Sequence, residues 1–147
     1  MKELIYMKKI RLEISKLEKS LLNLESTQFI SMDKNIYAIC ETYLMDACIK
    51  RFELTFDLLW KTLRVFFYYK GIELHYPKDV LKEGYLTDYL EDELLWLRML
   101  QDYNISAYSY DDTLASDLFK RIQLYIPLIR NAFNKLLKSV KEIECDA

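Results

Sequence analysis

The chain has 147 residues, a length typical of one domain, and 52% of them are hydrophobic, which is enough to bury a core. A formal net charge of −2 excludes a generally basic surface of the kind that coats nucleic acid. Two glycines and two prolines are too few for the turns of an all-β protein, so a single helical domain over residues 1–147 is predicted.

The first predicted helix covers residues 2 to about 26 and is amphipathic. Its apolar residues recur at spacings of three and four: Ile10, Ile14, Leu17, Leu21 and Leu24. A group of Ser, Thr, Asp and Asn then predicts a short loop near residues 27–33. Ser31 and Asp33 are the candidates to cap the next helix.

The second predicted helix is long, from about Lys34 to Lys70, because no breaker interrupts it. Gly71 is well placed as the residue just past its end. A short helix follows in YPKDVLKEGYL, with Pro77 in its first turn and Gly84 near its end.

Asp88 and Glu91 have the spacing of a capping box, which predicts that another helix opens there and continues through LEDELLWLRML. Asp111 or Asp112 is expected to cap the last helix, which reaches about residue 143. Pro127 lies inside that helix and is expected to kink or split it. The predicted fold is therefore an all-α, up-and-down four-helix bundle with one additional short helix.

Motifs for catalysis or metal binding are scarce. His75 is the sole histidine and lies in a loop, where an ordinary surface role is expected. The three cysteines form no CxxC pair, so neither a metal site nor a disulfide framework is predicted, and no cofactor is expected. No apolar run has the length of a membrane span and the N-terminal segment is charged throughout, so a cytoplasmic protein with no membrane contact is expected.

Two stretches carry a more specific signal. KRFELTFDLLWKTLRVFFYYKGIEL resembles the RFEFTFELAWK-like signature of the nucleotidyltransferase substrate-binding protein family. Its matching residues are Arg51, Phe52, Glu53, Thr55, Phe56, Trp60 and Lys61. LWLRMLQDYNISAYSYDD resembles that family's W-x-x-M-L-x-D-R-N-x-x-S-H-x-Y-D-E segment, and YPKDVLKEGYL resembles its Pro-containing short helix. The resemblance covers roughly residues 45–130.

The resemblance implies a HEPN-type helical bundle that forms homodimers and binds a minimal nucleotidyltransferase encoded beside it. In many HEPN proteins an Arg-x4-6-His motif forms a ribonuclease site, in which arginine steadies the phosphate and histidine removes a proton from the 2′-hydroxyl. In some related toxin–antitoxin pairs, the partner enzyme adenylylates a tyrosine two residues after that histidine.

Mapped onto this chain, the motif is degenerate. Tyr103 takes the place of the arginine and Tyr108 that of the histidine, whereas Asn104, Tyr110 and Asp111 match. A phenol with a pKa near 10 is a poor base at neutral pH, and neighbouring acids repel RNA. The resemblance thus implies a site that does not cut RNA, with Tyr110 as the candidate adenylylation acceptor.

Four further residues are candidates to line the same cleft: Arg51, Glu53, Lys61 and Arg98. The expected function is that of a non-catalytic substrate-binding partner of a minimal nucleotidyltransferase, in a two-component system of which a toxin–antitoxin pair is one form. A nucleotide or RNA is a further candidate ligand. The alternatives are an active ribonuclease toxin that uses tyrosines and a structural helical adaptor.

Overall fold

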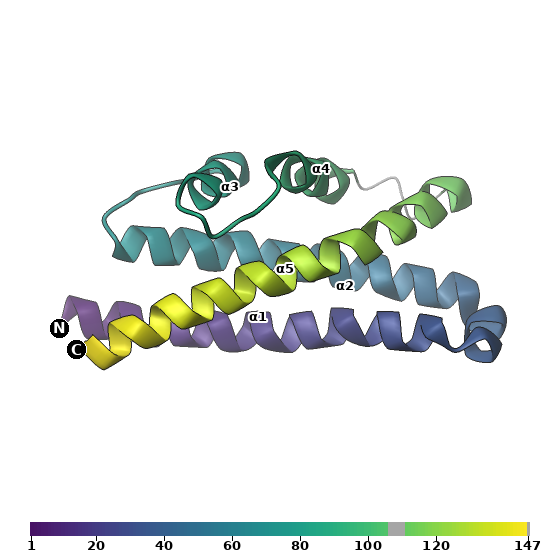
Figure 1. Cartoon of the computed structure of the whole chain (residues 1–147), viewed down its shortest axis with the longest axis horizontal. Helices are drawn as coiled ribbons and strands as arrows, with labels where there is room; N and C mark the ends of the chain where they lie inside the picture. The colour runs from purple at the N-terminus through teal and green to yellow at the C-terminus, as the bar shows by residue number, and fades with distance from the viewer. Residues whose placement is uncertain (106–110, 147) are drawn as a thin grey trace.

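The computed structural model describes residues 1–105 and 111–146 (Figure 1). Over these residues the chain forms helices and short connections, without a strand, so the all-α class is confirmed. The helices are α1 (Lys2–Met32), α2 (Lys34–Tyr69), α3 (Pro77–Leu86), α4 (Glu93–Asn104) and α5 (Asp112–Asp146).

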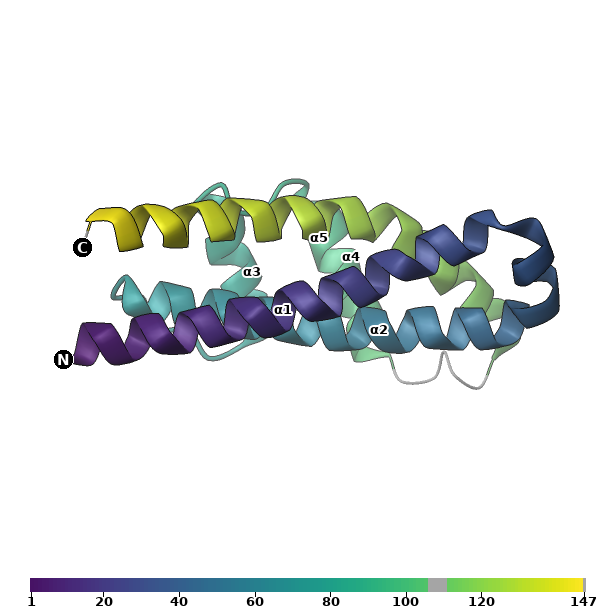
Figure 2. The same cartoon turned by 90° about the horizontal axis from the view of Figure 1, so that it is seen from below.

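The three long helices α1, α2 and α5 lie side by side, and the short helices α3 and α4 lie across them on one side (Figures 1 and 2). Both α2 and α5 run back toward the end where the two termini lie. This is the direction that the second and fourth members of an up-and-down bundle share. The short helices α3 and α4 take the place of the third member, because together they carry the chain back along the bundle before α5 begins.

The junction of α1 and α2 is shorter than predicted. The prediction of a loop near residues 27–33 is wrong, because α1 continues to Met32 and Asp33 alone separates the two helices. Ser26 and Thr27 fit into the helix because each hydroxyl donates to a carbonyl one turn earlier, at 2.7 Å. Asp33 caps α2 as predicted, accepting from two backbone N–H groups at 3.0 and 3.3 Å.

The end of α2 is a glycine-terminated turn, as predicted. Gly71 has a φ of 89°, in the left-handed region that favours glycine. Its N–H donates to the carbonyl of Tyr68 at 3.0 Å, and the N–H of Ile72 donates to that of Phe67 at 2.9 Å. Pro77 then opens α3 within its first turn, also as predicted.

The predicted capping box of Asp88 and Glu91 is wrong. Asp88 has a φ of 63°, and its N–H donates to the carbonyl of Tyr85 at 3.2 Å, so it closes α3 instead of opening the next helix. Asp92 takes the capping role for α4, since its side chain accepts from the N–H of Leu95 at 3.3 Å.

Two long helices carry irregularities. Cys40 interrupts the helical geometry of α2, with φ −117° and ψ 17°, where no break was predicted, and its surroundings give no cause for this. Pro127 does not split α5, which continues to Asp146. The buried side chains of Ile126 and Ile129 hold the backbone on both sides of the proline, so the helix tolerates one missing hydrogen bond.

One core joins all five helices of the described residues. The apolar stripe predicted for the first helix is buried along its whole length, and so is that of α2. The largest fully buried side chains are aromatic: Trp96, Tyr125, Phe52, Phe56, Phe66, Phe67 and Phe133. The aromatic run of α2 therefore builds the core of the chain itself.

Candidate functional site

Tyr103, which the resemblance aligns with the motif arginine, lies near the end of α4. Its ring packs on Phe56 of α2, with the ring centroids 5.0 Å apart. Its hydroxyl donates a hydrogen bond to Oδ1 of Asp57 at 2.7 Å, and Nζ of Lys61 donates to Oδ2 of the same carboxylate at 2.7 Å. Tyr103 therefore belongs to a polar cluster with Asp57 and Lys61.

Within this cluster the pKa values of Tyr103 and Asp57 are shifted in opposite directions. Burial, and then the hydrogen bond to Asp57, raises the pKa of Tyr103 to about 12. Burial also acts to raise the pKa of Asp57, but hydrogen bonds from Lys61 and Tyr103 outweigh it and hold that pKa below its ordinary value. At neutral pH the phenol is thus a donor and the carboxylate is charged.

Asp102, the residue before Tyr103, is 2% exposed and contacts α5. Arg121 donates to both of its carboxylate oxygens, from Nε at 2.8 Å and from Nη2 at 2.9 Å. The hydroxyl of Tyr125 donates to Oδ2 at 2.6 Å, and Nε of Arg98 lies 3.9 Å from Oδ1. The buried charge is therefore compensated, and the end of α4 is fixed to α5.

A row of aromatic rings connects the cluster around Asp102 with the cluster around Asp57. Ring centroids are 5.7 Å apart between Tyr125 and Phe52, 6.0 Å between Phe52 and Phe56, and 5.0 Å between Phe56 and Tyr103. Burial, and then the nearby Asp102 carboxylate, raises the pKa of Tyr125. The row gives both clusters a rigid apolar support.

The ends of the α4–α5 connection are anchored. Asn104 is the last residue of α4 and is exposed. Asp111 caps α5, as predicted, with its carboxylate accepting from the N–H groups of Thr113 and Leu114 at 2.9 and 3.1 Å. The predicted site residues Tyr108 and Tyr110 lie outside the described residues.

Glu53 joins this site but Arg51 does not. Glu53 lines a pocket of about 390 Å³ together with Asp57, Tyr103, Lys50 and Leu54. The Nη1 atom of Arg51 instead donates to two oxygens of α1, at 2.8 and 3.3 Å, and so fastens α2 to α1. The structure thus brings together Tyr103, Glu53 and Lys61 of the predicted cleft, with Arg98 beside Asp102.

Each basic side chain of the described site has an acidic neighbour. The pairs are Lys50 with Glu53 at 4.0 Å, Lys61 with Asp57 at 2.7 Å, Arg98 with Asp102 at 3.9 Å and Arg121 with Asp102 at 2.8 Å. A phosphate group entering this site would therefore compete with carboxylates for every cation. Geometry of this kind suits hydrogen bonding to a partner better than cleavage of a phosphodiester.

Sequence reasoning missed Asp57, Arg121 and Tyr125. Asp57 and Lys61 are four residues apart on one helix, a spacing at which an ion pair is readable from sequence. Arg121 and Tyr125 share the same spacing on α5, but their common partner Asp102 lies on another helix. No pattern within a single helix predicts a contact of this kind between residues far apart in the sequence.

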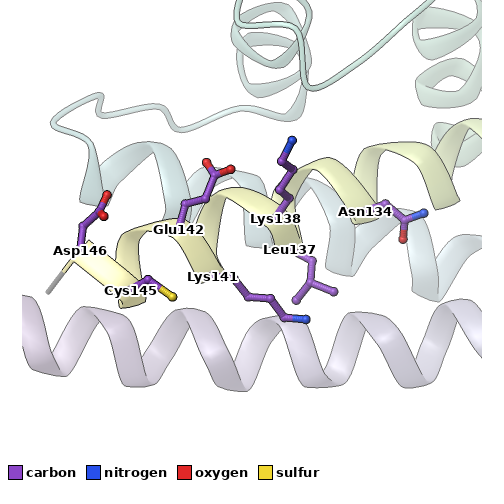
Figure 3. Close-up of a pocket in the computed structure, with 7 residues that line it drawn as sticks. All are labelled: Asn134, Leu137, Lys138, Lys141, Glu142, Cys145 and Asp146. Atoms are coloured by element: carbon purple, nitrogen blue, oxygen red, sulfur yellow. The ribbon is translucent and has the colours of Figure 1, made fainter.

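A larger hollow, about 610 Å³, lies elsewhere, on the C-terminal part of α5 (Figure 3). All the residues that line it come from that one helix. Lys138 and Glu142 point away from α1, whereas Leu137 and Lys141 point toward it, so the polar groups do not converge. This hollow is not a candidate site.

Among the described residues, no three His, Cys, Asp or Glu side chains are grouped as ligands of a metal ion. None of the helices in the described part of the chain has the length and apolar character required to cross a membrane.

The fold defines an all-α protein in which Tyr103, Asp57 and Lys61 form a polar cluster between α4 and α2. The model of the family described as "Nucleotidyltransferase substrate binding protein like" matches residues 12–138, and the chain belongs to this family. A crystal structure of a protein from Thermus thermophilus is similar, with a TM-score of 0.69 and 28% sequence identity. The match covers 82% of this chain and 98% of that one. A search of curated proteins gave no significant match.

Proposed function

We propose that this chain is the substrate-binding partner of a small nucleotidyltransferase and does not itself cut RNA. Family membership supports the first part. The second part rests on the hydrogen bond between Tyr103 and Asp57. That bond commits the side chain at the motif's arginine position to a carboxylate.

The chemistry of Tyr103 supports this reading. A phenol with a pKa of about 12 is ionised, at pH 7, in on the order of one molecule in 10⁵. Tyr103 therefore supplies neither the positive charge that steadies a scissile phosphate nor a base for the 2′-hydroxyl. Its neighbours Glu53 and Asp57 add negative charge to the same pocket.

The proposed contact surface for the nucleotidyltransferase is the α4–α5 junction. Asp102 and Asp111 fix the two helices that border it. Exposed polar groups, such as Asn104, are available there to a partner. Because these two helix ends are held in place, a partner that contacts them need not order them on binding.

Tyr110 is the proposed site of nucleotide transfer. Its phenol oxygen would attack the α-phosphorus of ATP on the partner enzyme, pyrophosphate would leave, and the phenol proton would pass to solvent. Intact-mass analysis after incubation with the partner and ATP should show one added AMP. The variant Tyr110→Phe should show none, whereas the exposed control Tyr43→Phe should be modified like the parent chain.

We also propose a homodimer. Large apolar side chains are exposed at the end where α1 meets α2: Phe29, Met32, Ile36, Ile39 and Tyr43. The ring of Tyr37 lies 6.2 Å from that of Phe119, so the beginning of α5 is at the same end. The variant Ile39→Lys, at a site 82% exposed, should shift the mass in light scattering from dimer to monomer without loss of helicity.

Co-purification with the nucleotidyltransferase encoded beside this chain tests the central proposal. A stable hetero-complex of defined mass is expected, weakened by the junction variant Asn104→Lys and unchanged by the distant surface variant Lys138→Gln. Absence of a complex would overturn the proposal. RNA cleavage by the purified chain that Tyr108→Phe abolishes would instead support the ribonuclease alternative.

A further inference from the structure

The beginning of α1 and the end of α2 lie together at the end of the molecule that holds the termini (Figure 2). A second polar pocket lies between them. Its volume is about 270 Å³. The side chains that give it its chemistry are Tyr6, Lys9, Arg64, Tyr68, Glu73 and His75. None of them belongs to the site around Tyr103.

Two tyrosines form an aromatic wall of this pocket. The rings of Tyr6 and Tyr68 lie with their centroids 5.3 Å apart and tilted by 45°. Tyr68 is 46% exposed, so part of its ring meets water. An aromatic surface at the edge of a polar pocket is suited to stacking against a nucleobase, and any of the bases can stack in this way.

The cations of this pocket are not neutralised by acids. Among the described residues, neither Lys9 nor Arg64 forms an ion pair with a carboxylate. The guanidinium of Arg64 lies over the Trp60 ring, 5.4 Å from its centroid, which holds it in place without cancelling its charge. This contrasts with the Tyr103 site, in which every described cation has an acidic neighbour.

Glu73 is the one carboxylate among the described residues that line this pocket, and it faces His75. Its Oε1 atom lies 3.7 Å from Nε2 of the imidazole. Two cations, Lys9 and Arg64, therefore line a pocket with one acid, so the pocket is locally positive on a chain whose net charge is −2. Such a field favours a ligand with a phosphate group.

We propose that this pocket binds a mononucleotide, with the base against Tyr68 and the phosphate between Lys9 and Arg64. A free phosphate would leave the tyrosines unused, and a nucleoside would leave the cations unused. The volume of about 270 Å³ lies just below the range for drug-sized ligand sites, about 300–1,000 Å³, so the pocket is limited to a ligand no larger than one nucleotide unit. The proposal stands independently of the partner enzyme.

Calorimetric titration of the untagged chain with AMP tests the proposal, with adenosine and inorganic phosphate as the two partial ligands. AMP should bind one site per chain, at least tenfold more tightly than either partial ligand. Arg64→Gln and Tyr68→Leu should each weaken AMP binding at least tenfold. The matched variants Lys120→Gln and Tyr85→Leu, at exposed positions outside this pocket, should bind AMP like the parent chain.

Folding of each variant is checked by its thermal melting curve. Because Arg64 packs on Trp60, its loss could destabilise the chain. Lys9→Gln, at an exposed position, is the variant that keeps the test decisive in that event. Absence of AMP binding, equal binding by inorganic phosphate, or unchanged affinity in folded Lys9→Gln and Tyr68→Leu variants would overturn the proposal.

Discussion

Arg121 and Asp102 form a two-point contact in which Nε and Nη2 of the guanidinium reach the two carboxylate oxygens at 2.8 and 2.9 Å. This contact links the end of α4 to the beginning of α5. The planar guanidinium matches the carboxylate in shape, so the pair fixes the orientation of both helices as well as their separation.

Replacing Asp102 by alanine should strongly destabilise the fold, because Arg121 and Tyr125 would lose their shared acceptor in a buried place. We expect a loss of about 3–5 kcal/mol in the free energy of unfolding. Chemical denaturation measures it. The exposed control Asp46→Ala should change that free energy by less than about 0.5 kcal/mol. A similarly small effect of Asp102→Ala would contradict a structural role for the pair.

Tyr103→Phe should change the stability at alkaline pH. The pKa of Tyr103 is raised from its ordinary value of 10.0 to about 12 in the folded chain. The stability that this shift contributes is therefore fully present below about pH 10 and is lost as the pH rises through about 12. Urea unfolding across this window should show a shallower decline for Tyr103→Phe than for the parent chain. Exposed Tyr43→Phe should follow the parent, and equal slopes for all three would refute the assignment.

Asp57→Asn should have the opposite pH signature. The folded chain lowers the pKa of Asp57 from its ordinary value of 3.8, so the charged carboxylate contributes stability above about that pH. This contribution is lost as the pH falls through the lowered pKa. The difference in unfolding free energy between the parent and Asp57→Asn should therefore shrink on acidification. A difference that stays constant with pH would show that Lys61 and Tyr103 do not stabilise the charge.

Gly84→Ala should destabilise the contact between α3 and the connection that follows it. A Cβ at this position would lie 2.8 Å from Cδ1 of the buried Leu90, which is closer than real contacts allow. We expect a cost of about 1–3 kcal/mol in thermal or chemical unfolding. The double variant Gly84→Ala with Leu90→Val should lose less than the sum of the single variants. Strict additivity would show that the two side chains do not compete for space.

Periodic apolar patterns predicted the fold because they are local. The stripes of α1 and α2, the glycine after α2 and the aspartate caps at Asp33 and Asp111 all act through neighbours within a turn or two of the chain. The predicted loop at residues 27–33 was wrong because serine and threonine are compatible with both a loop and a helix. In this chain the hydroxyls of Ser26 and Thr27 donate to helix carbonyls, so the helix continues.

The candidate site was predictable in part. The resemblance singled out Tyr103, and helical spacing placed Glu53 and Lys61 on roughly one face of α2; the structure places Tyr103 beside Glu53 in one pocket, but the role of these residues stays a prediction. The contacts between helices could not be predicted from the sequence. Asp57 of α2 bonds to Tyr103 of α4, and Asp102 of α4 bonds to Arg121 of α5. The packing of α3 and α4 across the long helices decides which side chains meet, and no pattern within a single helix encodes that packing.

The beginning of α1 and the end of α5 lie at the same end of the bundle (Figures 1 and 2), where Arg11 of α1 pairs with Glu144 of α5. Dyes attached to the two extremities of the chain would start within energy-transfer range and move apart when α1 separates from α5. The loss of energy transfer between the two dyes would then report the opening of the bundle, and no core residue would need to be replaced. A carrier protein fused at either extremity would also be held away from the α4–α5 junction, which stays accessible for docking.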